Sequence, residues 1–480
     1  MKYIFLLISL FTFNFLQAQV TGVVKDAAGE PIPGANVFWM NTTNGVTTNE
    51  DGNFSIHKPA RSHMLVVSFI GFENDTIHVD KGNQQLDIVL REGVELSEVN
   101  VVTRKLGTMK LRTSVMNEDM ISSAELTRAA CCNLGESFVT NPSVDVSYSD
   151  AATGAKQIKL LGLSGTYVQM MTENIPNFRG AAAPYGLGYV PGPWMQSIQV
   201  SKGSSSVKNG YESITGQINV EFKKPQLPEA DWVSANLFAS STNRYEANAD
   251  ATVKLSKRWS TSLLAHYENE TKSHDSNDDG FVDIPRVEQY NVWNRWAYMG
   301  DHYVFQAGIK ALHETRNSGQ IAHGNTPSHD LYEIGIKTNR YEAFTKNAYI
   351  FDKEKNTNLA LILQGTLHNQ DANYGRKLYD VDQSNFYASL LFETELSKQH
   401  SLSAGLSFNY DGYDQNYRLT NQAEEGLTKK FVKESVPGAY VQYTFNLNDQ
   451  LMLMGGIRGD YSSESVSYTH LRAHETELHL

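Results

Sequence analysis

The chain has 480 residues, with 41 Lys and Arg against 53 Asp and Glu, and a formal net charge of −12. This length allows two or three domains, and the acidic balance makes nucleic acid a poor partner. The two cysteines, Cys131 and Cys132, are adjacent, which excludes a scaffold of several disulfides. Beyond residue 18 there is no run of 18 apolar residues, so any membrane-spanning segment must be a β-strand.

The first 18 residues predict export. Lys2 is followed by an apolar run from Ile4 to Leu16, and Ala18 offers a small residue for cleavage before Gln19. The run is short for a spanning helix, and no Cys follows it to take a lipid. We interpret residues 1–18 as a signal peptide; the alternative is a buried N-terminal helix.

Residues 19–92 predict a small all-β domain. Short apolar runs at 35–39 and 65–69 alternate with turn sequences at 29–34 and 50–54. With Gly22-Val23-Val24 and residues 68–72, they resemble the carboxypeptidase-regulatory-like domain, which implies an immunoglobulin-like sandwich. Its histidines lack the His-x-x-Glu spacing of a zinc peptidase site, which favours a folded accessory module.

Residues 93–107 are predicted to be a linker that carries a short β-prone peptide. This peptide consists of Leu96, Ser97, Glu98, Val99, Asn100, Val101 and Val102. Strand addition to a partner requires such a tethered peptide, because backbone hydrogen bonds supply the affinity. The peptide resembles a TonB box. The alternative is an edge strand of the preceding sandwich.

Residues 108–225 combine helical composition at 118–132 with short apolar runs that are separated by glycines. Ser122 and Glu125 have the spacing of a capping box. The segments Glu173-Asn174-Ile175-Pro176, 198–203 and 210–220 follow one another in an order that resembles the plug domain of TonB-dependent receptors. Gln199 and Lys202 depart from the Glu and Arg that the family tends to have at these two positions.

Residues 230–465 predict strands of about 10 to 16 residues with many aromatic side chains. Short polar turns are predicted near 240–243, 256–258, 299–301, 352–357, 397–400 and 448–450. Long polar loops are predicted near 271–286, 315–333, 370–382 and 419–435. This alternation is typical of an up-and-down membrane barrel, whereas a soluble sandwich explains only the aromatic residues. We count about eleven strands, about half of a 22-stranded plugged barrel. The candidates for the aromatic girdle are Tyr267, Trp293, Trp296, Phe386 and Tyr387.

Residues 466–480 stop alternating and place His470, His474 and His479 among charged residues. We interpret this segment as a non-native tail. Amplification of the genomic locus tests this hypothesis, and a stop codon directly after Leu480 would contradict it.

Two constellations are candidates for cation binding. Asp275, Asn277, Asp279 and Asp283 occupy positions 1, 3, 5 and 9 of an EF-hand-like loop with Gly280 at position 6, although Arg286 stands where a bidentate Glu belongs. This pattern predicts a calcium loop, and the alternative is a solvated acidic loop. The thiolates of Cys131 and Cys132 could bind a soft metal or form a strained vicinal disulfide, and the alternative is a buried pair of small apolar side chains.

The resemblance identifies the chain as a C-terminally truncated TonB-dependent receptor of the Bacteroidetes type. It implies a mainly β fold: an immunoglobulin-like sandwich, a mixed α/β plug and a partial transmembrane antiparallel barrel. It further implies an outer-membrane location, with the N-terminal and linker segments in the periplasm. Its partners would be TonB with its inner-membrane energising proteins, outer-membrane lipid and an imported small ligand.

The implied function is active import of a scarce ligand, for which we favour a metal ion, a metal chelate or a siderophore. Oligosaccharide and cobalamin stay open as ligands. The alternative is an outer-membrane adhesin or structural barrel. No cofactor is required, although calcium is a candidate. No Ser/His/Asp order, carboxylate pair or phosphate loop in the sequence argues for an enzyme.

Overall fold

The structure is a computed structural model that describes residues 19–475 with internal gaps. The gaps are 27–28, 41, 43, 60–62, 70–71, 73–74, 80–84, 91–107, 111–116, 130–131, 140, 142–143, 204–205, 227–231, 322–330, 421–425, 448–450 and 465–467. The chain divides into two compact units, residues 1–102 and 103–480. Among the described residues, no helix is long and apolar enough to cross a membrane.

The first unit is a two-sheet β-sandwich, as predicted. Its strands are β1 (Gln19–Lys25), β2 (Asn36–Trp39), β3 (Gly45–Thr47), β4 (Asn53–His57), β5 (Met64–Ser68), β6 (Asp75–His78) and β7 (Gln85–Val89). One sheet has the order β4-β1-β7 and the other β3-β2-β5-β6. Alternate side chains such as Val20, Trp39 and Ile56 are buried between the sheets in an apolar core. The Trp39 indole N–H donates to the His57 carbonyl oxygen at 2.8 Å, which satisfies its polar group inside that core.

The plug begins the second unit. Its elements are β8 (Thr108–Lys110), β9 (Asn117–Ser122), α2 (Ser123–Arg128), β10 (Val144–Asp150), β11 (Ala155–Leu160), β12 (Leu163–Ser164), β13 (Val168–Thr172), β14 (Ile175–Pro176), β15 (Met195–Lys202) and β16 (Gly216–Phe222). Six of the strands form one sheet in the order β14-β13-β16-β15-β9-β8, and β10, β11 and β12 form a second sheet. Short 3-10 turns connect these strands, among them η3 (Gly180–Ala182) and η4 (Gly186–Tyr189).

The predicted helix over residues 118–132 is wrong in its first part. Residues 117–122 form strand β9, because they pair along β15, and this tertiary pairing overrides local helix propensity. The helix starts at Ser123, where the Ser122 hydroxyl accepts the Glu125 N–H at 3.4 Å. The Glu125 carboxylate pairs with Arg128 at 2.6 Å instead of reaching back, so only half of the predicted capping box forms.

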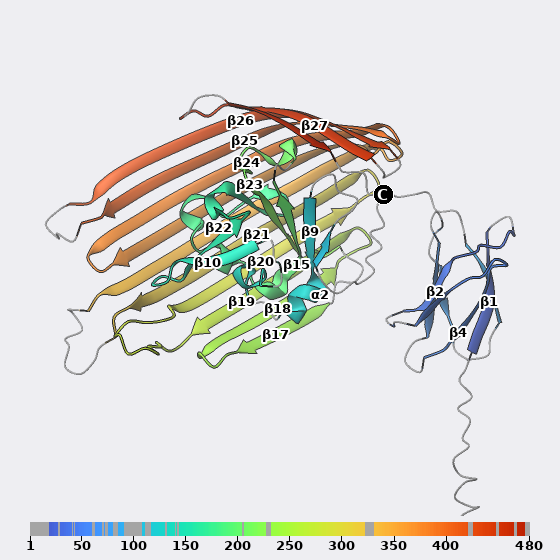
Figure 1. The fold of residues 1–480 in the computed structure, drawn as a ribbon, viewed down its shortest axis with the longest axis horizontal. Helices are drawn as coiled ribbons and strands as arrows, with labels where there is room; N and C mark the ends of the chain where they lie inside the picture. The colour runs from blue at the N-terminus through green and yellow to red at the C-terminus, as the bar shows by residue number, and fades with distance from the viewer. Residues whose placement is uncertain are drawn as a thin grey trace, which may run out of the picture. The chain divides into compact units, whose positions relative to one another are not determined.

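The remaining residues form one sheet of twelve consecutive antiparallel strands, which we call the barrel sheet (Figure 1). Its strands are β17 (Val233–Ala239), β18 (Arg244–Lys254), β19 (Trp259–Glu270), β20 (Arg286–Met299), β21 (Tyr303–Gly319), β22 (Glu333–Asp352), β23 (Thr357–Tyr374), β24 (Lys377–Ser397), β25 (His400–Arg418), β26 (Thr428–Leu447), β27 (Leu451–Asp460) and β28 (Tyr468–Glu475). The last strand lies inside the segment interpreted as a non-native tail. It pairs with β27, so the sheet has one strand more than predicted. Strand pairing uses the backbone and does not need alternating side chains, and the origin of the tail stays a prediction.

Short connections lie at one end of the barrel sheet, the turn end, at residues 255–258, 300–302, 353–356 and 398–399. Long ones lie at the other end, the loop end, at residues 271–285, 320–332 and 419–427. The predicted long loop at 370–382 is wrong, because β23 and β24 run on to a turn of two residues, Gly375 and Arg376. The predicted loops at 315–333 and 419–435 are likewise shortened by β21 and β26. In each case polar residues continue the backbone ladder, which polar composition alone does not reveal.

The outer face of the barrel sheet carries two rows of aromatic rings. Trp259, Tyr298 and Phe305 form the turn-end row, with ring centroids 5.1 and 6.2 Å from Trp259. Tyr267, Tyr290 and His313 form the loop-end row, with centroids 5.0 and 6.5 Å from Tyr290. Eight residues of β19 separate the rows, which is about 27 Å along the strand and about 20 Å after a tilt of roughly 40°. Between the rows, Leu263, Val292 and Ile309 are exposed.

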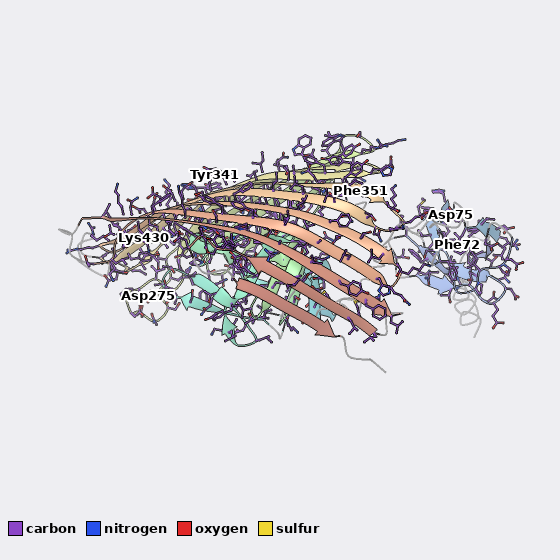
Figure 2. The ribbon with its side chains drawn as sticks, turned by 90° about the horizontal axis from the view of Figure 1, so that it is seen from above. Phe72, Asp75, Asp275, Tyr341, Phe351 and Lys430 are labelled. Carbon is purple, nitrogen blue, oxygen red and sulfur yellow. The ribbon has the colours of Figure 1, made fainter. Side chains whose placement is uncertain are left out.

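The predicted girdle residues divide between the two faces of the sheet. Trp296 and Phe386 are exposed and Tyr267 is half-buried on the outer face, whereas Trp293 and Tyr387 are buried on the inner face. The spacing requires this division, because side chains one or three residues apart on a strand point to opposite faces. Figure 2 shows Asp275 and Lys430 at the loop end and Phe351 toward the turn end.

The plug lies against the inner face of the curved barrel sheet (Figures 1 and 2). One apolar cluster joins the two, and it includes Trp194 and Phe222 of the plug with Trp293 and Leu312 of the sheet. The rings of Phe222 and Trp293 meet edge to face with centroids 4.6 Å apart. Outside this cluster the plug contacts the sheet through polar and charged groups, which build the candidate site.

Candidate functional site

The loop end of the plug has a floor of small residues. Gly180, Ala183 and Pro184 are exposed there, at and just after the 3-10 turn η3. Gly180 has a φ of +59°, and a Cβ at this position would meet the Tyr413 hydroxyl and the Gln383 amide of the barrel sheet. Only glycine therefore allows the plug backbone to come this close to the wall.

Tyrosines surround this floor. Tyr374, Tyr379, Tyr413 and Tyr417 occupy inward positions at the loop ends of β23, β24 and β25. Tyr374 lies beside Tyr185 of the plug, and the Tyr379 hydroxyl donates to the Gln415 side-chain oxygen at 3.3 Å. We call these five tyrosines the tyrosine basin. Tyr185 is buried, and the half-buried phenol rings of the four barrel tyrosines offer flat faces for stacking and hydroxyls for hydrogen bonds, which suits an organic ligand with rings.

Arg179 fixes the floor to the wall. Its guanidinium lies 2.7 Å from Asp411 on β25 and 2.9 Å from Glu212 of the plug. In the adjoining turn η3, the Ala181 N–H donates to the Gln383 side-chain oxygen at 2.9 Å. Burial raises the pKa of Glu212, and the Arg179 charge only partly opposes this rise. The floor is thus held by one cation shared between two carboxylates.

The turn between β13 and β14 makes the second charged contact. Glu173 and Asn174 have φ values of 51° and 62°, the left-handed conformation that a two-residue hairpin turn needs. The Glu173 carboxylate lies 2.5 Å from Arg295 of β20, and Lys346 of β22 donates to the Glu173 carbonyl oxygen at 2.6 Å. Burial opposes ionisation of Glu173, but Arg295 and Lys346 outweigh it and hold the pKa of its carboxyl below the usual range.

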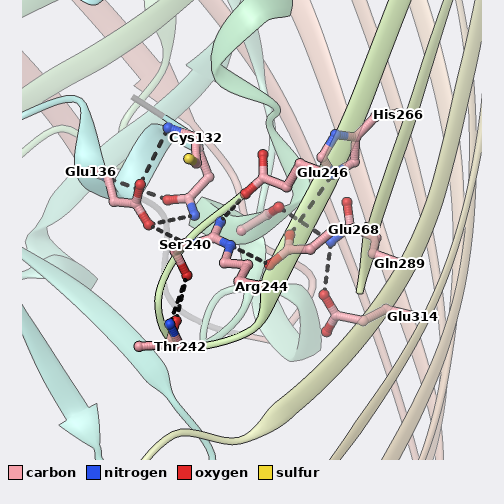
Figure 3. A network of polar contacts seen from close by, with 12 residues as sticks. Cys132, Glu136, Ser240, Thr242, Arg244, Glu246, His266, Glu268, Gln289 and Glu314 are labelled. Atoms are coloured by element: carbon pink, nitrogen blue, oxygen red, sulfur yellow. Dashed lines mark hydrogen bonds and ion pairs between the residues drawn. The ribbon is translucent and has the colours of Figure 1, made fainter. Parts of the chain in front are cut away.

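A third contact lies at β18 and β19. Figure 3 shows Arg244 between Glu136 of the plug and Glu246 and Glu268 of the sheet. The guanidinium lies 2.9 Å from Glu136, 2.6 Å from Glu246 and 3.0 Å from Glu268. The Arg244 and Lys156 charges overcome the burial of Glu136 and lower the pKa of its carboxyl. This network closes the plug against the first strands of the sheet.

Comparison with known proteins matches these parts. Residues 20–102 match the CarboxypepD_reg-like domain, and residues 110–217 match the TonB-dependent receptor plug domain. The TonB-dependent receptor SusC of Bacteroides thetaiotaomicron is 28% identical over 245 residues, which cover 48% of this chain and 24% of SusC. Together these matches support a TonB-dependent receptor of the Bacteroidetes type, with a CarboxypepD_reg-like domain ahead of the plug domain.

Solved receptors share the fold. FauA, the alcaligin outer-membrane receptor of Bordetella pertussis, has 14% identity and a TM-score of 0.59, covering 80% of this chain and 64% of FauA. The copper transporter OprC has 12% identity and a TM-score of 0.60, covering 76% of this chain and 59% of OprC. The chain thus spans less than two thirds of these receptors and about a quarter of SusC.

The predicted TonB box of this receptor, Leu96 to Val102, lies outside the described residues, and so does Cys131. Cys132 is buried beside the Arg244 network. Burial, together with the Glu246 carboxylate, raises the pKa of its thiol, which keeps the thiol protonated at neutral pH. A protonated thiol is a poor metal ligand. The metal role of the cysteine pair stays a prediction that this environment does not favour.

The predicted calcium loop of the receptor is an exposed turn at the loop end. Asp275 accepts the backbone N–H groups of Asp279 at 3.2 Å and Gly280 at 2.9 Å, and Asp283 accepts that of Ser276 at 2.7 Å. No group of three or more His, Cys, Asp or Glu side chains in the described parts of the chain is arranged to hold a metal ion. Calcium binding by Asp275, Asn277, Asp279 and Asp283 stays a prediction.

Sequence reasoning missed the charged residues that join the plug to the barrel wall. Arg179, Glu173 and Arg295 were not singled out, although the family resemblance covered Glu173. A usable signal was present in the strands: in β21, Lys310, Glu314 and Arg316 occupy even positions between less polar neighbours. Charges that share one face of a transmembrane strand point into the lumen.

Proposed function

We propose that the full-length receptor lies in the outer membrane and imports a scarce ligand with energy delivered by TonB. The two aromatic rows support the location, since they flank an apolar face of nearly the height expected for lipid contact. In this orientation the turn end faces the periplasm and the loop end faces the outside. The sandwich and the linker would then lie in the periplasm, where TonB can reach residues 96–102.

The plug supports the import proposal, because it packs against the inner face of the barrel sheet and carries the floor of the tyrosine basin. A ligand would bind to the basin from outside, and TonB would add a strand to the peptide at residues 96–102 and pull. The plug would then yield at its charged contacts with the wall. No side chain has to perform covalent chemistry in this mechanism.

The basin favours an organic ligand with rings. Phenol faces and hydroxyls suit a siderophore, a metal chelate or an oligosaccharide better than a bare metal ion. Among our candidates we prefer a metal chelate or siderophore, since FauA is an alcaligin receptor and OprC a copper transporter. Cobalamin and oligosaccharide are the alternatives to be measured alongside.

Val101→Pro in the full-length receptor tests this proposal, because proline removes a backbone donor from the strand that TonB would add. Val101→Ala is the matched control, since it shortens the same side chain and keeps the donor. Cells with TonB would be offered ferric siderophores, copper chelates, cobalamin and oligosaccharides, and accumulation would be measured.

We expect the proline variant to lose uptake of one of these substrates while cell-surface binding stays normal, and the alanine variant to behave as wild type. Equal uptake of every substrate by both variants contradicts TonB-driven import and favours the adhesin alternative.

A further inference from the structure

The inner face of β20, β21 and β22 carries a column of cations. Lys346, Arg295, Lys310, Arg340 and Arg316 follow one another from the turn end to the loop end, and we call them the cation ladder. Lys346 pairs in register with Gln306, and Arg295 with Gly308. Arg340 pairs with Leu312, and Lys310 and Arg316 lie on β21 itself. The ladder thus spans the ten residue-to-residue steps from 306 to 316 of β21, which is about 33 Å along the strand.

The ladder gives this wall a positive charge. Only two carboxylates, Glu314 and Glu342, share the inner face between the same levels, so that five positive charges meet two negative ones. Lys310 lies 3.7 Å from Glu342, Arg340 lies 2.8 Å from Glu342, and Arg316 lies 3.0 Å from Glu314. The wall therefore keeps a net charge of +3 after its own ion pairs are counted.

The plug supplies a hydrogen-bond acceptor to each cation of the ladder, and we call these five cations its rungs. Lys346, Arg295, Lys310 and Arg316 reach backbone carbonyl oxygens of the plug, at Glu173, Lys223, Tyr189 and Thr153 respectively. Arg295 also holds the Glu173 carboxylate, and Arg340 donates to the Asn177 side-chain oxygen at 2.6 Å. When the plug moves away, the rungs lose these acceptors, and buried cations without partners are costly.

A cavity already lies between the plug and this wall. Its lining includes Thr172, Glu173 and Ile175 of the plug turn, Lys310 and Glu342 of the ladder wall, and Gln364 of β23. Next to the ladder, the buried polar atoms of His368 and Gln370 include several without a hydrogen-bond partner. On the acidic wall of β18 and β19, Arg244 likewise bridges the plug and the sheet. At the ladder, a path between plug and wall would start from this cavity.

We propose that the imported ligand is an anion that passes along the cation ladder, whose rungs exchange plug acceptors for the negative groups of the ligand. This inference rests on the proposed import function and narrows its substrate class. Carboxylate-rich or catecholate chelates, and acidic oligosaccharides, carry the required charge. A cationic or bare metal ligand does not fit this wall. Cationic side chains that line a pore select anions in the same way.

Ion selectivity of the full-length receptor tests the ladder. The receptor is placed in planar bilayers, urea is added on the plug side until channels open, and the reversal potential in a KCl gradient gives the chloride-to-potassium permeability ratio. Neutralisation of two rungs by Lys310→Gln with Lys346→Gln is expected to lower this ratio by about two-fold or more. Lys310→Arg with Lys346→Arg keeps the charges and should keep the ratio.

Two further variants make the result decisive. Lys257→Gln with Lys353→Gln removes the same net charge from exposed turns, and it should leave the ratio at the wild-type value. Gln364→Glu adds a negative charge to the cavity beside Lys310 and should lower the ratio even if the double neutralisation fails to insert. A ratio that is unchanged by Gln364→Glu and by ladder neutralisation, or that falls equally in the turn variant, overturns the anion path.

This measurement needs neither TonB nor the natural ligand. An unaffected ratio would refute the anion path while TonB-dependent uptake could still be observed. Loss of TonB dependence in the uptake experiment would refute import while the ladder could still set the ratio. The two failures are therefore distinguishable.

Discussion

The core of the sandwich and the contact of the plug with the barrel wall differ in their chemistry. Among its described residues, the sandwich closes on a cluster of thirteen buried apolar side chains, which includes Val20, Trp39 and Ile56. The plug meets the barrel wall through part of its apolar core, but it adds charged contacts through Glu173, Arg179 and the cations of the wall. Separation of an apolar contact exposes apolar surface to water, which is unfavourable, whereas water hydrates charged groups after they separate. The difference indicates that the sandwich is built to remain folded and the plug to part from its wall.

The largest effect is expected in the sandwich. Trp39→Ala removes a fully buried indole and its hydrogen bond to His57, which should cost about 3 to 5 kcal/mol of sandwich stability. Hydrogen exchange of the full-length receptor should then show loss of protection in β1 to β7. Protection in the plug should not change, and a loss there would contradict the independence of the two units.

The next effect concerns the plug turn. Glu173→Gln leaves Arg295 buried without its carboxylate, which should weaken attachment of the plug by about 3 kcal/mol. The urea concentration that opens channels in planar bilayers should fall. Asn174→Asp, next to it in the exposed part of the same turn, is the control. An unchanged urea threshold in Glu173→Gln would show that the pair does not hold the plug.

Acid should weaken the attachment of the plug through Glu173. The folded pKa of Glu173 lies below its ordinary value of 4.5, so its contribution to stability is present above pH 4.5 and is lost as the pH falls through the folded pKa. At pH values below 4.5, the urea concentration that opens channels of the wild-type receptor should therefore fall. The Glu173→Gln variant should lack this part of the drop, and parallel curves for the two proteins would contradict the assignment.

The smallest effect is expected at the surface. Arg258 and Asp301 form an ion pair of 2.8 Å between two turns at the turn end, and both side chains are largely exposed. Arg258→Ala should change stability by at most about 1 kcal/mol, because water screens such pairs. Thermal unfolding at low salt should show a shift at the limit of detection. A large loss would mean that exposed pairs matter as much as buried ones.

The fold was predictable where the pattern of the sequence was strong. Turn residues located the sandwich strands, and the alternation of short and long polar segments located most connections of the barrel sheet. The hairpin at Tyr374 and Lys377 was not predictable from polarity, because backbone pairing there continues through polar residues. The first part of the predicted helix over residues 118–132 was misjudged for a related reason, since pairing with β15 makes residues 117–122 the strand β9.

The site was less predictable than the fold. Side-chain direction in a strand alternates, so the face of Trp293 or Tyr387 depends on register, which a single sequence does not fix. Across the contact between plug and wall, Glu173, Arg179 and Arg244 have partners 108 to 232 residues away in the chain, and no local pattern connects them. The tyrosine basin likewise assembles from three strands and the plug.

Urea titration of the full-length receptor, followed by hydrogen exchange, tests the contrast between sandwich and plug most directly. We predict that β13 and β16 of the plug lose protection at a lower urea concentration than β1, β2 and β5 of the sandwich, while β20 to β22 keep theirs. Loss of protection in the sandwich first, or in plug and barrel together, would contradict an account in which the plug is the part that yields.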